Sequence, residues 1–152
     1  MTAANGKENI ALVEINHGPY LVKPINEAFD DGQRPINIHA SNVVWLDYKN
    51  TSWVSSKSKA EISFLLNDHE YKSLFVKLPK GYIGTFETNG SILHSVVIQG
   101  QLSYDMPQGQ ETKVLDAGSY FGSTENATHK VKNISNGATM LYIRTNGAVY
   151  VK

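Results

Sequence analysis

The 152-residue chain contains no cysteine. This absence excludes disulfides, thiolate metal sites and cysteine nucleophiles together. An excess of either charge is also lacking, because 14 Lys and Arg residues balance 14 Asp and Glu residues. Such a balance gives no sign of a nucleic-acid partner, which a basic patch would indicate. It also leaves little charge to oppose self-association, so an oligomer is compatible with the composition. We expect a homodimer formed through β-strands and the N-terminal region.

Long apolar runs are missing as well. No run approaches the roughly 18 to 20 residues that span a bilayer, so we expect no membrane partner. The start of the chain, MTAANGKENIALVEI, lacks the charged-then-apolar order of a signal peptide. The same small polar opening also suits a mature chain from which a signal peptide has been removed. The expected localisation is therefore cytoplasmic, or periplasmic in the second case.

Helical periodicity is almost absent, and short runs rich in Val, Ile and Tyr take its place. Turn dipeptides such as Asn89-Gly90 and Asn136-Gly137 separate many of these runs. Short strands at close spacing, with turn residues between them, predict an all-β sandwich or barrel. We expect strands at 10–15, 20–22, 43–46, 60–66, 71–78, 92–98, 102–104, 113–115, 128–131, 140–144 and 148–151. Residues 26–29 are expected to form a helical turn at most.

The length of the chain predicts one domain with a core of its own. Residues 23–42, KPINEAFDDGQRPINIHASN, are the least regular stretch and contain two prolines. We expect residues 1–42 to supply N-terminal strands and an irregular arm that packs on a barrel formed by residues 43–152. A surface loop and an arm swapped onto a partner subunit are both open for this stretch.

The second half of the chain carries a recognisable pattern. The segments FETNGSILHSVVIQGQL and LDAGSYFGSTENATHKVKN resemble the two characteristic motifs of the cupin superfamily. Gly118, His129 and Asn133 match the second motif, in which an asparagine follows the histidine by four positions. The chain is most similar to small uncharacterised ChrR-like cupins, over about residues 70–151. The resemblance implies a single-domain cupin jelly-roll β-barrel with an N-terminal strand extension.

The first motif departs from the family at its ligand positions. Gly81 and Gly100 match its two ends. Counted back from Gly100, the family's His-x-His pair falls on Glu87 and Asn89, and its glutamate falls on Leu93. Leucine cannot bind a metal, and asparagine is a weak neutral ligand for a transition ion. The three-histidine, one-glutamate site that the resemblance implies is therefore not present as such.

A rebuilt metal site would use Glu87, His94 and His129, which together supply two imidazoles and a carboxylate. The candidate ions are Zn, Fe, Mn and Ni, and no metal at all is the alternative. Strand alternation argues against His94, because Leu93 and His94 face opposite sides unless a bulge intervenes. The strand face that carries His94 is the more apolar of the two, so we expect it to be covered.

The candidate ligand pocket consists of Glu87, Asn89, Leu93 and His129. Each polar member has a structural alternative: a hydrogen-bonded buried histidine, a solvated glutamate, and a turn asparagine. A barrel of this kind holds one small ligand in its interior. We therefore expect a small-molecule partner.

Three functions stay open at the level of sequence. A metal-dependent enzyme would use the ion as a Lewis acid or to activate water, and the resemblance implies small polar, carboxylate or sugar-like substrates. A metal-free cupin would bind a ligand without chemistry, which the loss of both first-motif histidines favours. A sensor or interaction module is the third, because ChrR-like cupins can regulate a partner.

Overall fold

The computed structural model describes residues 23–27, 37–107, 109 and 111–152. The chain divides into two units, Met1–His39 and Ala40–Lys152. Among the described residues of the first unit, the 3-10 turn η1 (Ile25–Glu27) overlaps the helical turn expected at 26–29, of which residues 28 and 29 are not described. The strands expected at 10–15 and 20–22 lie outside the described residues, and the packing of residues 1–42 on the barrel stays a prediction. Among the described residues, no helix is long and apolar enough to cross a membrane.

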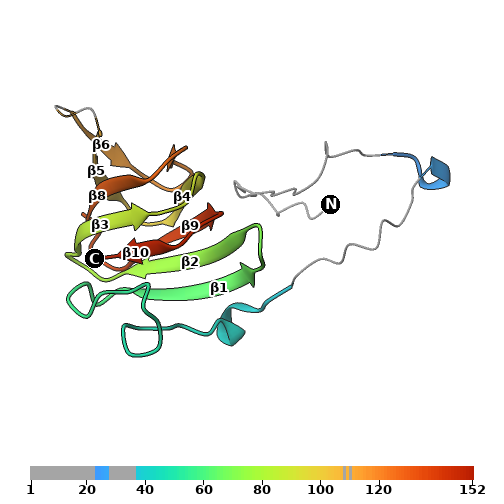
Figure 1. Ribbon diagram of the computed structural model, residues 1–152, viewed down its shortest axis with the longest axis horizontal. Coiled ribbons are helices and arrows are strands. Elements are labelled where there is room, and N and C mark those ends of the chain that lie inside the picture. The colour runs from blue at the N-terminus through green and yellow to red at the C-terminus, as the bar shows by residue number, and fades with distance from the viewer. Residues whose placement is uncertain (1–22, 28–36, 108, 110) are drawn as a thin grey trace. The chain divides into compact units, whose positions relative to one another are not determined.

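The second unit begins with a short 3-10 helix and continues as ten antiparallel strands in two five-stranded sheets (Figure 1). The elements are η2 (Ala40–Asn42), β1 (Glu61–Asn67), β2 (Lys72–Leu78), β3 (Ile83–Thr88), β4 (Leu93–Gln99), β5 (Leu102–Asp105), β6 (Thr112–Leu115), β7 (Tyr120–Ser123), β8 (Ala127–Asn133), β9 (Thr139–Thr145) and β10 (Val149–Val151). One sheet has the order β1-β2-β9-β4-β7 and the other the order β10-β3-β8-β5-β6. The expected all-β class is confirmed.

Two strands, β3 and β7, were not predicted from the sequence. Each contains a glycine, Gly84 or Gly122, which reads as a turn signal when the local sequence is considered alone. Both strands pair with partners far along the chain, β3 with β8 and β7 with β4. The strand expected at 43–46 is wrong, because only Leu46 pairs there, through an isolated bridge to Ile62.

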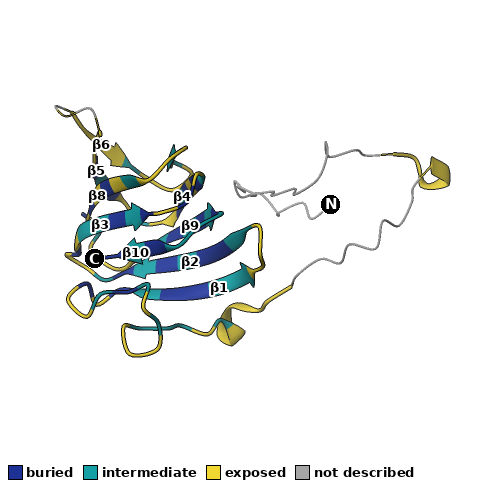
Figure 2. Cartoon of the chain, viewed as in Figure 1, coloured by how far each residue is buried: buried dark blue, intermediate teal, exposed yellow. Residues whose placement is uncertain are grey.

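Alternation along the strands separates the core from the surface (Figure 2). On β4, Leu93, Ser95 and Val97 are buried, whereas His94 and Ile98 are exposed. The expectation that the face of His94 is covered is therefore wrong. The two sheets enclose the face of β4 that carries Leu93. The pairing register of β4 determines which face is buried, although the opposite face carries more apolar residues.

Two loops with the same sequence, Thr-Asn-Gly, hold each other at one end of the barrel. They follow β3 and β9. The Asn89 Oδ1 atom accepts a hydrogen bond from the Ala148 backbone N–H at 2.7 Å. The Asn146 Oδ1 atom accepts one from the Ile92 backbone N–H at 3.0 Å. The loops are thus joined by reciprocal side-chain bonds.

Asn133, at the end of β8, connects loops elsewhere in the barrel and is 2% exposed. Its amide nitrogen lies 2.8 Å from the Pro79 carbonyl and 2.9 Å from the Gly137 carbonyl. Its amide oxygen accepts from the Ser135 backbone N–H at 2.9 Å and from the Thr139 hydroxyl at 2.8 Å. The asparagine of the second motif therefore has a structural role here.

Candidate functional site

His129 faces the interior of the barrel and is 1% exposed. It lies on β8 directly opposite Phe86 of β3, and residues that pair in this way point to the same side of a sheet. Phe86 is a core residue, so the pairing register carries the His129 ring inward. This is the position that a pocket residue needs.

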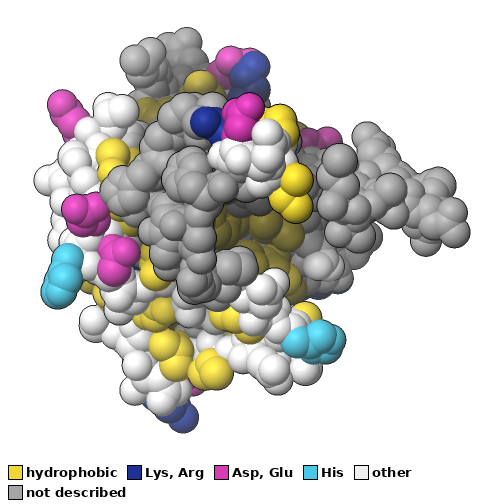
Figure 3. Space-filling model, turned by 90° about the vertical axis from the view of Figure 1, so that its right-hand side faces the viewer, with side chains coloured by type: hydrophobic (Ala, Val, Ile, Leu, Met, Phe, Trp, Pro, Cys, Tyr) yellow, Lys and Arg dark blue, Asp and Glu magenta, His cyan; other side chains and the backbone are white. Residues whose placement is uncertain are grey.

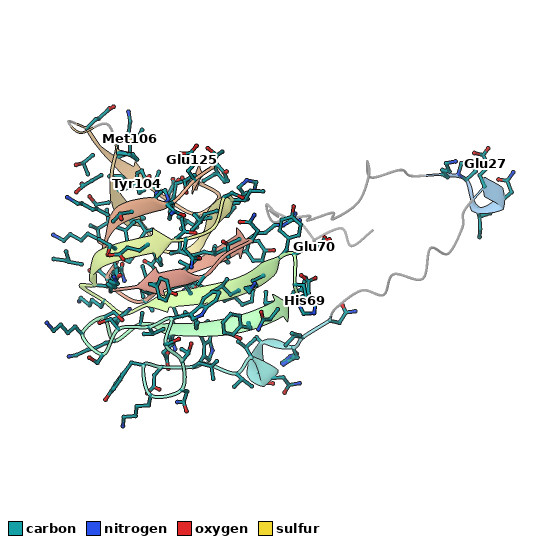
Figure 4. The ribbon with its side chains drawn as sticks, viewed as in Figure 1. Glu27, His69, Glu70, Tyr104, Met106 and Glu125 are labelled. Atoms are coloured by element: carbon teal, nitrogen blue, oxygen red, sulfur yellow. The ribbon has the colours of Figure 1, made fainter. Side chains whose placement is uncertain are left out.

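Two side chains from two other strands hydrogen-bond to His129, one at each ring nitrogen. The Tyr104 hydroxyl, on β5, lies 2.8 Å from His129 Nδ1 (Figure 4 marks Tyr104). The other ring nitrogen, Nε2, lies 3.1 Å from the Ser123 hydroxyl on β7. Both ring nitrogens are thus engaged by neutral partners.

The protonation states indicate which group donates in each of these two hydrogen bonds. Burial raises the pKa of the Tyr104 phenol and lowers the pKa of the His129 imidazole, so both groups are neutral near pH 7. The phenol proton needs an acceptor in a buried site, and His129 Nδ1 is the acceptor within reach. Nε2 then carries the imidazole proton and donates it to Ser123. Ser123 itself is half-buried, so its hydroxyl keeps access to hydrogen-bond partners other than His129.

A second interior hydroxyl has no partner. Ser95 is fully buried on β4, and its Oγ atom makes no hydrogen bond to any described residue. Ser95 pairs with Phe121, and Ser123 pairs with Leu93, so the two serines are diagonal neighbours on the same inner face. Diagonal side chains of this kind lie about 7–8 Å apart at the backbone. The two hydroxyls therefore lie on one face of the β4–β7 pair, two residues apart in register.

Aromatic rings surround these polar atoms. The Phe121 ring centroid lies 4.9 Å from that of Tyr104, 5.3 Å from that of His129 and 6.3 Å from that of Phe86. Leu93, which the sequence assigned to the pocket, is fully buried on the same inner face. The wall of the site is apolar, with hydroxyls and one neutral imidazole as its polar groups.

Glu87 and Asn89, the other two expected pocket residues, point elsewhere. Glu87 follows inward-facing Phe86 on β3, so it lies on the outer face, where its carboxylate pairs with the Lys152 ammonium. Asn89 is exposed and its side-chain oxygen is bonded to the β9–β10 loop. The structure therefore does not bring these two side chains to His129.

His94 is also separated from His129. It is exposed on the outer face of β4, where its ring centroid lies 5.8 Å from that of Tyr120. Within residues 23–27, 37–107, 109 and 111–152, no three His, Asp or Glu side chains gather in a way that could hold a metal ion. The set Glu87, His94 and His129 is thus not assembled, because alternation sends two of its members outward.

A separate cavity of about 390 Å³ lies at the β5–β6 hairpin. Its wall includes Thr128 and Lys130, the two neighbours of His129 in the sequence. Both are exposed, so this cavity is on the outer side of the sheet. It does not include the side chains that hydrogen-bond to His129.

The arrangement of the serine, the histidine and the tyrosine also bears on whether the serine could act as a nucleophile. Ser123, His129 and Tyr104 have the spacing of a nucleophile, a base and an orienting group. With the neutral Tyr104 phenol assigned as the donor to Nδ1, Nε2 carries the imidazole proton, and in this tautomer it does not accept the serine proton. Burial also lowers the basicity of the imidazole. The arrangement is suited to hydrogen bonding and poorly suited to nucleophile activation.

Sequence reasoning did not single out Tyr104, Ser123 or Ser95. A local signal existed for Ser95 alone, since it shares the alternating face of Leu93. The approach of Tyr104 and Ser123 to His129 depends on the pairing of β5 with β8 and of β7 with β4. That register cannot be deduced from the separate strand segments.

Comparisons with known proteins agree with this architecture. The family model described as "Domain of unknown function (DUF4437)" matches residues 1–152. An RmlC-like cupin from Shewanella frigidimarina NCIMB 400 is 17% identical, with a TM-score of 0.57 over 76% of this chain and 94% of that chain. An RmlC-like cupin from Ralstonia eutropha JMP134 is 14% identical, with a TM-score of 0.57 over 74% of this chain and 69% of that chain.

The polyketide cyclase RemF from Streptomyces resistomycificus is also similar, at 9% identity and a TM-score of 0.60 over 76% of this chain and 83% of that chain. No curated protein matches the sequence. Likeness at such low identity concerns the fold, and it confirms the expected cupin jelly-roll.

Proposed function

The chain belongs to the DUF4437 family, whose description names no activity. From the interior side chains we propose that the protein binds a small uncharged molecule inside its cupin barrel without a metal ion. One observation carries the proposal. The Ser95 hydroxyl is buried with no hydrogen-bond partner among the described residues, and the half-buried Ser123 hydroxyl, which bonds to His129, lies on the same inner face. Buried polar groups of folded proteins nearly always have a partner, a protein group or an ordered water, and in this proposal the ligand supplies the partner of Ser95.

Charge supports an uncharged ligand. Among the described residues, none of the buried polar side chains is Asp, Glu, Lys or Arg. Figure 3 shows hydrophobic side chains near the middle of one outer face, whereas the charge that an interior ligand meets depends on the interior residues alone. An ionised ligand would lose its hydration in the interior without gaining a counter-charge, at a cost of several kcal/mol. The carboxylate substrates that the family resemblance implies are therefore disfavoured.

The donor set does not fit the metal that cupins typically hold. Among the described residues the interior offers one imidazole, and both of its nitrogens are hydrogen-bonded to Tyr104 and Ser123. A metal at Nε2 would displace the serine and require the opposite tautomer. The carboxylate of Glu87, the nearest match to a family ligand position, is paired with Lys152 on the outer face.

Binding of matched fragments tests this proposal. Each pair would share one aromatic ring and carry either a primary amide or a carboxylate, and binding would be measured by calorimetry. The amides should bind, and Ser95→Ala and Ser123→Ala should each weaken them about fivefold to tenfold through a lost hydrogen bond. Ser103→Ala is the matched control, because Ser103 lies on β5 with its side chain on the opposite face from Tyr104.

Two results would contradict the proposal. One is preferential binding of the carboxylates, which would require a positive group or a metal in the site. The other is amide binding that Ser95→Ala and Ser123→Ala leave unchanged. The expected homodimer also stays a prediction, and analytical ultracentrifugation would check it.

A further inference from the structure

The sequence contains the dipeptide Asn-Gly at four places, and three of them lie in the described residues. These three are Asn89-Gly90, Asn136-Gly137 and Asn146-Gly147, and Asn5-Gly6 lies outside them. Asn-Gly is the dipeptide most prone to deamidation, because glycine offers the least steric hindrance to attack by its own backbone nitrogen on the asparagine side chain. The local structure decides whether that attack can occur.

In two of the dipeptides, hydrogen bonds oppose deamidation. The Gly90 backbone N–H donates to the Thr88 hydroxyl at 3.1 Å, and the Gly147 backbone N–H donates to the Thr145 hydroxyl at 3.1 Å. The side chains of Asn89 and Asn146 are bonded across to the opposite loop. The nucleophile and the carbon under attack are therefore both fixed, and reaction requires local opening.

Asn136-Gly137, in the β8–β9 loop, is free of these restraints. Both residues are exposed. Among the described residues, neither the Asn136 side chain nor the Gly137 backbone N–H has a hydrogen-bond partner. A Cβ atom built on Gly137 would meet nothing within 4 Å, so the space around the dipeptide is open. The side chain can turn toward the glycine nitrogen without breaking a bond.

We propose that Asn136 is the site of spontaneous deamidation in the folded barrel. The deprotonated Gly137 nitrogen attacks the side-chain amide carbon of Asn136. A new C–N bond closes a succinimide ring, and the amide nitrogen leaves as ammonia. Water then opens the ring to aspartate or isoaspartate, so the net reaction consumes one water and releases one ammonia, with no redox change.

The modification would act on a structural network. The Gly137 carbonyl accepts a hydrogen bond from Asn133 at 2.9 Å. Isoaspartate lengthens the backbone beside that carbonyl by one methylene group and adds a negative charge to the loop. Ageing of the protein would therefore loosen the link between the β8–β9 loop and the rest of the barrel.

Peptide mapping by mass spectrometry of the full chain, after incubation at mildly alkaline pH, tests the proposal. Asn136 should convert at least roughly tenfold faster than Asn89 and Asn146, because those sites must first open. Gly137→Ala should slow conversion at Asn136, and the open space around Gly137 lets the variant fold. Thr145→Val should speed conversion at Asn146 by freeing the Gly147 N–H.

The comparison of sites within the wild-type chain stands even if Thr145→Val fails to fold. Equal rates at the three sites, or faster conversion at Asn89 or Asn146, would overturn the proposal. Amide hydrogen exchange gives a second reading. The Gly137 N–H should exchange faster than those of Gly90 and Gly147, and the reverse order would overturn the assignment.

Discussion

Replacement of Asn133 by alanine tests the structural role of the second motif. The side chain is almost fully buried, and its amide donates to backbone carbonyls of two loops while its oxygen accepts two bonds. A buried hydrogen bond contributes about 0.5–1.5 kcal/mol net, so four bonds give an upper value of about 6 kcal/mol. Some partners keep other bonds: Thr139 still reaches Ser135, and Pro79 still accepts from Tyr82.

The expected loss for Asn133→Ala is therefore about 3 kcal/mol in the free energy of unfolding, which lowers Tm by roughly 10 °C. Urea denaturation and calorimetry would measure it. Asn136→Ala is the matched control, since Asn136 is exposed in the neighbouring loop and its replacement should change stability by less than about 0.5 kcal/mol. Equal stability of the two variants would refute the assignment of Asn133 as a structural link.

Three further predictions concern the interior and the loops. Because burial lowers the pKa of His129 from its ordinary value of 6.5, the unfolded state binds the proton more tightly. The free energy of unfolding should then be constant above pH 6.5 and should decrease as the pH drops below 6.5. Urea midpoints measured between about pH 8 and pH 5 should show this decrease, and His129→Gln should make the midpoint less dependent on pH. Tyr104→Phe leaves His129 Nδ1 buried without a donor and should cost about 1–2 kcal/mol by denaturation, whereas an unchanged midpoint would speak against the hydrogen bond. Gly90→Ala places a Cβ 2.7 Å from the Gly147 nitrogen and should lower Tm clearly, in contrast to Gly137→Ala, which meets nothing.

The sequence was sufficient for the fold class because short alternating runs and turn dipeptides are local signals. The second motif also drew attention to His129, expected as a pocket residue or a hydrogen-bonded structural histidine, and the structure buries its side chain in the interior. The strands β3 and β7 were missed for a physical reason: glycines weaken their local pattern, and pairing with β8, β10 and β4 stabilises them instead.

The candidate site was harder to predict because it depends on which face of each strand points inward. Glu87 and His94 are chemically suitable ligands, yet each neighbours a residue that the core requires, Phe86 or Leu93. Alternation then sends the ligand outward. Tyr104 and Ser123 reach His129 through long-range register, which strand segments read singly do not contain.

The central claim is that the barrel binds its ligand without a metal. Elemental analysis of protein purified without chelators from medium supplemented with Zn, Fe, Mn and Ni tests it most directly, with His129→Gln analysed beside the wild type. We predict no stoichiometric metal in either protein. About one ion per chain in the wild type, lost in His129→Gln, would contradict the account, because His129 would then be a metal ligand.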